Sequence, residues 1–163
     1  MADFNAAIVK TLGREGSAKI TEIPGDAGGL TKYGISQRAY PNLNIRELTE
    51  QQARDIYKRD YWDRVCGDRI NSQIIAESVF DFAVNAGVVT ASKLAQMAIG
   101  NTRPDGVMGA NTVAQLNAAI NRPEDFLTSY TLLKISRYAA ICNKDKTQTK
   151  FLLGWINRAL GGM

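Results

Sequence analysis

The sequence SQIIAESVFDFAVNAGV, residues 72–88, carries the clearest helical pattern in the chain. One set of its apolar residues recurs at intervals of four, three and four: Ile75, Val79, Phe82 and Ala86. Residues at these intervals lie on one face of an α-helix, and Ser72 is a suitable N-cap for the first turn. The pattern therefore predicts a helix over residues 72–88 with one face buried in the core.

Most of the chain outside this segment also shows a helical period. We expect further helices from about Ala6 to Gly13, from Thr49 to about Trp62, from Thr90 to about Gly100, over 110–121, from Pro123 to about Cys142 and from Phe151 to Leu160. Residues 16–36 lose the period and hold Pro24 and five glycines, a composition typical of a structured loop or small hairpin. The sequence thus predicts an all-α fold, or an α fold with a small β-hairpin or loop lobe.

The composition is that of a globular chain with one informative absence. Its 163 residues suit a single domain, and 45% of them are hydrophobic while 22% are charged. The chain has no histidine, which excludes histidine general bases, histidine-dependent serine and cysteine proteases, and histidine-ligated zinc. We expect Cys66 and Cys142 to be reduced thiols, with a single bridge as the alternative, and we expect no metal and no cofactor. Carboxylates and hydroxyls must then supply any catalysis.

Charge and hydropathy limit the expected partners. The net charge is only +4, and no basic stripe with interleaved aromatic residues occurs, so we expect no nucleic-acid partner. The first seven residues lack the basic start and apolar core of a secretory signal, and no apolar run approaches the roughly 18 residues of a membrane span. We therefore expect a monomer made in the cytoplasm, without stable membrane insertion.

Three polar residues of the glycine-rich excursion form a candidate catalytic set. Glu15 closes the first helix and opens the excursion, and Asp26 and Thr31 lie within it. A carboxylic acid, a second carboxylate and a hydroxyl are the groups that hydrolyse a glycosidic bond without histidine: one acid protonates the leaving oxygen while the others position water. The alternative is that Glu15 and Asp26 are surface charges or hydrogen-bond acceptors that order the loop.

A resemblance to a known family favours the catalytic interpretation. The runs REGS at 14–17 and DAGGLTKYGIS at 26–36 resemble the opening of glycoside hydrolase family 108, a family of phage endolysins and bacterial N-acetylmuramidases. Similar motifs follow in matching order over nearly the whole chain: YW at 61–62, DFAVNAG at 81–87, DGVMGANT at 105–112 and FLLGWINR at 151–158. The resemblance implies a lysozyme-like helical fold.

The resemblance also implies roles for single residues. It makes Glu15 the catalytic acid. Asp26 and Thr31 fall where the related Glu–Asp–Thr phage lysozymes place their other two groups, although the spacing here differs from theirs. Ser17 replaces the second glycine of the family's opening motif and Ala18 replaces the aromatic residue that usually follows it, which removes a candidate surface for sugar stacking.

Further residues are candidates for substrate contacts. Glu77, Asp81 and Asn85 form one polar line along the predicted helix, which is either a solvated face or a row in which Asp81 and Asn85 bind sugar. Tyr33 either stacks on a sugar or fixes the loop. We expect Trp62 and Trp155 to be core anchors.

Two segments of the second half also have two interpretations. The turn 105–112 resembles peptidoglycan-binding turns, or it serves only the folding of its own half. Residues 150–160 either pack on the core or contact a membrane or wall surface.

Together these observations predict a peptidoglycan hydrolase, an endolysin that cleaves the β-1,4 bond between N-acetylmuramic acid and N-acetylglucosamine. We expect one lysozyme-like domain over residues 1–163, with a catalytic half at 1–88 and a helical, peptidoglycan-binding half at 89–163. The partner is then a peptidoglycan strand in the periplasm, which the enzyme reaches with a holin or a dedicated export route. The alternatives are a non-catalytic peptidoglycan-binding module and a lytic transglycosylase.

Overall fold

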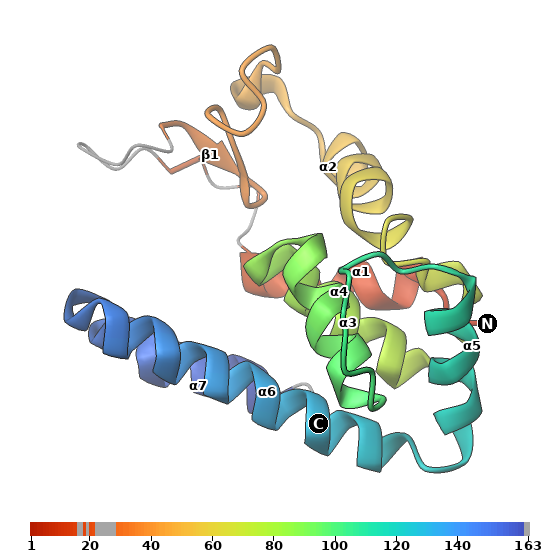
Figure 1. Ribbon diagram of the computed structural model, residues 1–163. Helices are drawn as coiled ribbons and strands as arrows, with labels where there is room; N and C mark the ends of the chain where they lie inside the picture. Colours follow the sequence, from red (N-terminus) through yellow and green to blue (C-terminus); the bar gives the residue numbers. More distant parts are fainter. Residues whose placement is uncertain (16–17, 19, 22–28, 162–163) are drawn as a thin grey trace.

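The computed structural model describes residues 1–15, 18, 20–21 and 29–161 of the chain, and this part is mostly helical (Figure 1). Its α-helices are α1 (Phe4–Glu15), α2 (Glu50–Tyr57), α3 (Gln73–Ala86), α4 (Val88–Ala98), α5 (Ala110–Ala118), α6 (Pro123–Lys144) and α7 (Leu152–Leu160). One small sheet pairs β1 (Thr31–Lys32) with β2 (Ile35–Ser36). Short 3-10 or π turns cover Ile45–Glu47, Lys58–Trp62, Gly67–Arg69, Ala119–Asn121 and Lys146–Phe151. The predicted α fold with a small hairpin is confirmed.

Helix α3 supplies the centre of the core. The side chains of Ile75, Val79 and Phe82 are almost completely buried, as their spacing predicts. Trp62 is fully buried beside the first turn of α1, with its ring centroid 5.7 Å from that of Phe4 and within an aromatic cluster that extends onto α3. This confirms Trp62 as a core anchor.

The C-terminal helices attach to α3 through aromatic contacts. Tyr130 and Tyr138 of α6 pack edge-on against Phe82, with ring centroids 5.8 and 6.2 Å away. Trp155 of α7 stacks on Tyr138 at 5.3 Å, so α7 packs on α6 as expected for a core-facing helix. Leu153 on the same helix remains 71% exposed. Helix α7 is thereby held against the part of α3 that carries Asp81.

The hairpin forms because its turn sequence suits a tight connection. Tyr33 and Gly34 occupy the two turn positions with φ of +53° and +76°, the backbone that a two-residue hairpin loop requires. Ile35 is buried, whereas Thr31 and Lys32 are half-buried. Figure 1 shows this lobe projecting from the side of the helices.

Several helix boundaries differ by a few residues from the sequence prediction. Helix α1 begins at Phe4 and continues past Gly13 to Glu15, since a single helical glycine costs only about 1 kcal/mol and does not by itself end a helix. Helix α4 begins at Val88 and not at Thr90, because Gly87, with φ of +89°, ends α3 and also serves as the N-cap of α4.

The turn at residues 105–109 is organised by a residue that the sequence did not single out. The buried Gln96 donates to Asp105 Oδ1 at 2.7 Å and to the Val107 carbonyl at 3.1 Å, and its own oxygen accepts from the Gly106 amide at 2.9 Å. Because these bonds satisfy the turn internally, they support a folding role for this turn.

Within the described residues, Cys66 and Cys142 are free thiols, as expected. No helix in that part of the chain is both long and apolar enough to cross a membrane. In the same part, no group of three or more acidic or cysteine side chains is arranged to hold a metal ion.

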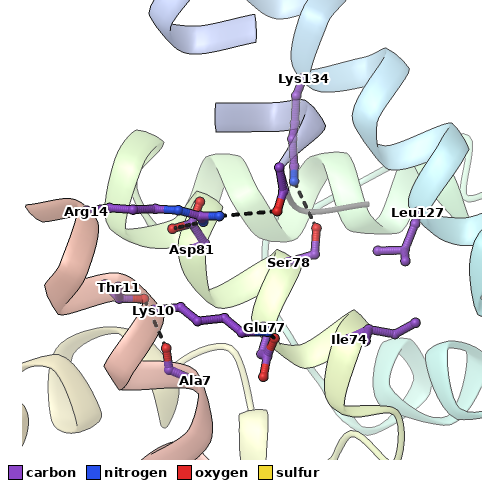
Figure 2. A pocket seen from close by; sticks show the side chains of 11 residues that line it. Ala7, Lys10, Thr11, Arg14, Ile74, Glu77, Ser78, Asp81, Leu127 and Lys134 are labelled. Carbon is purple, nitrogen blue, oxygen red and sulfur yellow. Dashed lines mark hydrogen bonds and ion pairs between the residues drawn. The ribbon is translucent and has the colours of Figure 1, made fainter. Parts of the chain in front are cut away.

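A polar cavity of about 120 Å³ lies between α1, α3 and α6 (Figure 2). Lys10 and Arg14 reach it from α1, Glu77 and Asp81 from α3, and Lys134 from α6. Charged side chains from three helices therefore meet just behind the C-terminal end of α1.

Candidate active site

Glu15 is the last residue of α1, at the point where the chain leaves the helix for the hairpin lobe. Its side chain is 22% exposed. The hairpin turn packs directly against it: a Cβ on Gly34 would lie 2.7 Å from the Glu15 Cβ. Glycine at this turn therefore lets the backbone of the lobe approach the carboxyl-bearing side chain.

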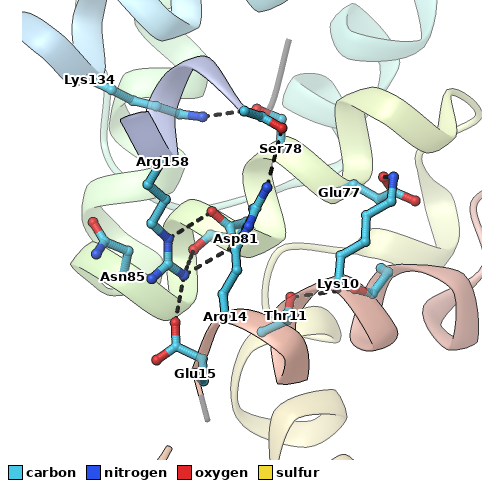
Figure 3. A network of polar contacts seen from close by, with 12 residues as sticks. Lys10, Thr11, Arg14, Glu15, Glu77, Ser78, Asp81, Asn85, Lys134 and Arg158 are labelled. Atoms are coloured by element: carbon cyan, nitrogen blue, oxygen red, sulfur yellow. Dashed lines mark hydrogen bonds and ion pairs between the residues drawn. The ribbon is translucent and has the colours of Figure 1, made fainter. Parts of the chain in front are cut away.

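An arginine from the far end of the chain lies next to the Glu15 carboxyl group. Arg158 Nη2, on α7, is 2.6 Å from Glu15 Oε1 (Figure 3). This oxygen is buried, and among the described residues it accepts no hydrogen bond of good geometry, so the contact is an ion pair. The Arg158 side chain is itself only 19% exposed, which limits screening of the pair by water.

Asp81 fixes the orientation of this arginine. Arg158 donates from Nε to Asp81 Oδ2 and from Nη2 to Asp81 Oδ1, both at 3.0 Å, which is the two-pronged geometry of a strong arginine–carboxylate pair. Arg14 Nη1 lies 3.0 Å from the same Oδ1. Two arginines and two acidic side chains thus form one connected quartet of Arg14, Glu15, Asp81 and Arg158.

Two tyrosines adjoin Glu15 as neutral hydroxyl groups. Burial and the negative charge of Glu15 raise the pKa of Tyr57 well above its usual range. Burial, Asp60 and Glu15 raise the pKa of Tyr61 in the same direction. The Tyr57 hydroxyl donates to the Tyr33 carbonyl at 3.0 Å, so it ties the hairpin turn to α2.

The structure brings only some of the predicted site residues together. Thr31 lies in β1, two residues before the Tyr33–Gly34 turn that covers Glu15, and its hydroxyl makes a long 3.5 Å contact with the Gly29 carbonyl. Tyr33 is half-buried within that turn. Asp26 and Ser17 lie outside the described residues, and Ala18 is exposed.

The polar line along α3 is engaged within the protein. Glu77 pairs with Lys10 at 2.6 Å, and Asp81 is held by two arginines. Asn85 Oδ1 accepts from the Tyr138 hydroxyl at 3.2 Å. Each of these three side chains therefore has a partner within the protein and does not simply face solvent, and Asp81 holds Arg158 in place.

Comparison with known proteins relates the two halves of the chain to two families. Residues 8–87 match the family described as Glycosyl hydrolase 108, and residues 90–160 match the family described as Predicted Peptidoglycan domain. Residues 8–87 belong to the glycosyl hydrolase 108 family. The glycosyl hydrolase 108 segment contains Glu15 and Asp81, whereas Arg158 lies in the second match.

A solved structure shows the same fold over nearly the full chain. The structure of Brucella abortus SagA is 25% identical in sequence, has a TM-score of 0.72, and aligns with 97% of this chain and 94% of its own. None of the curated proteins is similar enough to match. With the glycosyl hydrolase 108 segment and the peptidoglycan domain together, the chain is a peptidoglycan hydrolase or a peptidoglycan-binding protein.

The sequence did not reveal Lys134, a buried cation that lies behind the candidate active site. It is 3% exposed, donates to Ser78 Oγ at 2.9 Å and lies 4.3 Å from the ring centre of Tyr130. Burial lowers its pKa from 10.5 to about 8, Asp81 opposes this shift, and the nearby arginines add to it. The sequence offers one hint that Lys134 is buried, its place between aromatic residues of the α6 segment. This pattern is equally typical of a lysine whose charged end reaches solvent.

We expect Lys134→Met to stabilise the protein near neutral pH. Below about pH 8 the folded chain holds a buried ammonium group. The lowered pKa of Lys134 corresponds to a loss of up to about 3 kcal/mol in the free energy of unfolding. After the loss of the bond to Ser78, we expect a net gain of about 1–2 kcal/mol in the free energy of unfolding. The gain should shrink as pH rises from 8 to 10.5, since the wild-type lysine then loses its proton when folded.

Urea unfolding at several pH values measures this difference. The exposed Lys144 at the end of the same helix provides the control, and Lys144→Met should leave stability nearly unchanged at every pH. A Lys134→Met variant that is less stable than wild type at pH 7 would show that the buried ammonium contributes favourably.

Proposed function

We propose that this chain is an N-acetylmuramidase of the endolysin type. It hydrolyses the β-1,4 bond between N-acetylmuramic acid and N-acetylglucosamine, and Glu15 is the general acid. The position of Glu15 carries the proposal: a half-buried carboxyl group ends a helix of the glycosyl hydrolase 108 segment, with a hairpin turn packed against it. Such a partly dry carboxyl group beside a polar lobe suits proton donation to a glycosidic oxygen.

The reaction follows from the groups available. Protonated Glu15 gives its proton to the oxygen that leaves with N-acetylglucosamine, while the C1–O4 bond breaks and C1 of N-acetylmuramic acid acquires oxocarbenium character. Water then bonds to C1 and gives up a proton, and Glu15 takes up a proton again, so that the cycle consumes none overall. We assign Asp26 and Thr31 to position this water, because the resemblance implies that role and Thr31 lies on the strand leading to the Glu15 turn.

Substrate contacts are assigned to Tyr33 and Asn85, with Asp81 acting through Arg158. Tyr33 lies in the turn against Glu15, and Asn85 lies one helical turn beyond Asp81 on α3. An aromatic ring and an amide suit a sugar face and an N-acetyl group. The enzyme is proposed to act on the periplasmic wall after release by a holin or an export route, as the family resemblance implies.

Fragment release from purified, insoluble peptidoglycan tests this proposal. The expected result is soluble, reducing glycan fragments that appear at a rate proportional to enzyme concentration. A protein that pellets with the wall and releases nothing would instead be a peptidoglycan-binding module, and the proposed hydrolase activity would be wrong.

A further inference from the structure

We infer that Arg158 is a positioning residue for Glu15, so that the peptidoglycan-domain segment completes the active site and does not act solely as a wall-binding module. This inference rests on the proposed function. Its basis is the contact between two segments that match different families: Glu15 lies in residues 8–87 and Arg158 in residues 90–160, yet their charged atoms are 2.6 Å apart.

The arginine is held in one orientation before any substrate binds. Two of its nitrogens form the bidentate pair with Asp81, and Nη2 also contacts the Asp81 carbonyl at 3.4 Å. Arg14 Nη1 also contacts Asp81 Oδ1, at 3.0 Å, and Arg14 Nη2 donates to the Gly161 carbonyl at 3.2 Å. Because α1, α3 and α7 all contribute to this arrangement, the guanidinium has little freedom to turn away from Glu15.

The chemistry explains why a cation at this position helps catalysis. When Glu15 transfers its proton to the leaving oxygen, the electron pair of the broken O–H bond stays on Glu15 as a carboxylate. A fixed guanidinium 2.6 Å away stabilises that developing charge without reorganisation.

The other groups that face Glu15 do not replace this cation. Charged and titratable side chains reach it from α1, from α2 and the π turn that follows, from α3 and from α7: Arg14, Tyr57, Tyr61, Asp81 and Arg158. The two tyrosines are neutral, and among the ion pairs of the described residues Arg14 contacts Asp81 rather than Glu15. Removal of the Arg158 charge should therefore weaken the stabilisation of the Glu15 carboxylate.

The test compares kcat and KM of wild type, Arg158→Met, Arg158→Lys and Asp81→Asn on purified peptidoglycan. For Arg158→Met we expect kcat to fall by about 10- to 100-fold with a much smaller change in KM. Arg158→Lys keeps the positive charge, so it should recover part of the lost kcat, but not all of it, because lysine cannot make the two-pronged contact with Asp81.

Glu77→Gln is the matched control. Glu77 lies one turn before Asp81 on α3 and pairs with Lys10 of α1 at 2.6 Å, so it also links the two helices but does not contact Glu15. Its variant should keep the wild-type kcat and KM. A general loss of helix packing would change the Glu77 and Arg158 variants alike.

The outcomes separate this inference from the proposed function. If wild type is active and folded Arg158→Met has an unchanged kcat, the positioning role is wrong and the muramidase proposal stands. If Arg158→Met does not fold, an unchanged kcat in Arg158→Lys and Asp81→Asn still overturns it. If wild type releases no fragments at any pH, both proposals fall.

Discussion

Glu15→Gln is expected to lower the rate of peptidoglycan cleavage by about 10²- to 10⁴-fold. Glutamine keeps the size and the hydrogen-bonding oxygen of the side chain, but it has no acidic proton to give to the leaving oxygen. The rate of fragment release from purified peptidoglycan measures the loss.

The fold and the binding of wall material should survive this substitution. Glu15 is the last residue of its helix, and its side chain lies beside the hairpin turn, Arg158 and two tyrosines rather than in the hydrophobic core. Thermal unfolding and pelleting with insoluble peptidoglycan check both properties. Glu124→Gln, at an exposed position on α6, is the control and should cleave at the wild-type rate. Wild-type activity in folded Glu15→Gln would show that Glu15 is not the general acid.

Gly34→Ala is expected to destabilise the protein by about 3 kcal/mol and to reduce cleavage strongly. A Cβ at this position would lie 2.5 Å from the Tyr57 hydroxyl and 2.7 Å from the Glu15 Cβ, distances that force the lobe or the acid to shift. The φ of +76° adds strain for any residue with a side chain. Overpacking and strain at one residue have magnitudes of this order. Urea unfolding and fragment release measure the two effects.

Gly13→Ala provides the contrast within the same region. Gly13 lies inside α1, two residues before Glu15, and a Cβ there meets nothing within 4 Å. Because alanine is the better helix former, this variant should gain up to about 1 kcal/mol in stability and keep its activity. A Gly34→Ala variant as stable and active as wild type would mean that the turn does not pack on Glu15 as described.

The sequence predicted those parts of the site that lie close together along the chain. The helical period of residues 72–88 was enough to predict α3, and the glycine content of residues 16–36 was enough to predict a structured loop or small hairpin, because both signals are local. Glu15 was singled out because a chain without histidine needs a carboxylic acid, and the family resemblance supported this choice. Asp26 remains a prediction, since it lies outside the described residues.

The partners of the polar residues could not be predicted in the same way. Asp81 and Asn85 were assigned to sugar binding because an exposed polar line suits either solvent or a ligand. The structure pairs Asp81 with Arg158, 77 residues away, and Asn85 with Tyr138, 53 residues away. Such contacts depend on how α6 and α7 pack on α3, and no local period encodes that packing. Lys134 was missed for the same reason.

The most direct test of the central claim is mass spectrometry of the fragments that wild type releases from purified peptidoglycan, with Glu15→Gln digested in parallel. Hydrolysis adds water at C1, so the account predicts new reducing ends on N-acetylmuramic acid that are absent from the Glu15→Gln digest. New reducing ends on N-acetylglucosamine, or anhydro ends formed without water, would contradict the proposed muramidase reaction.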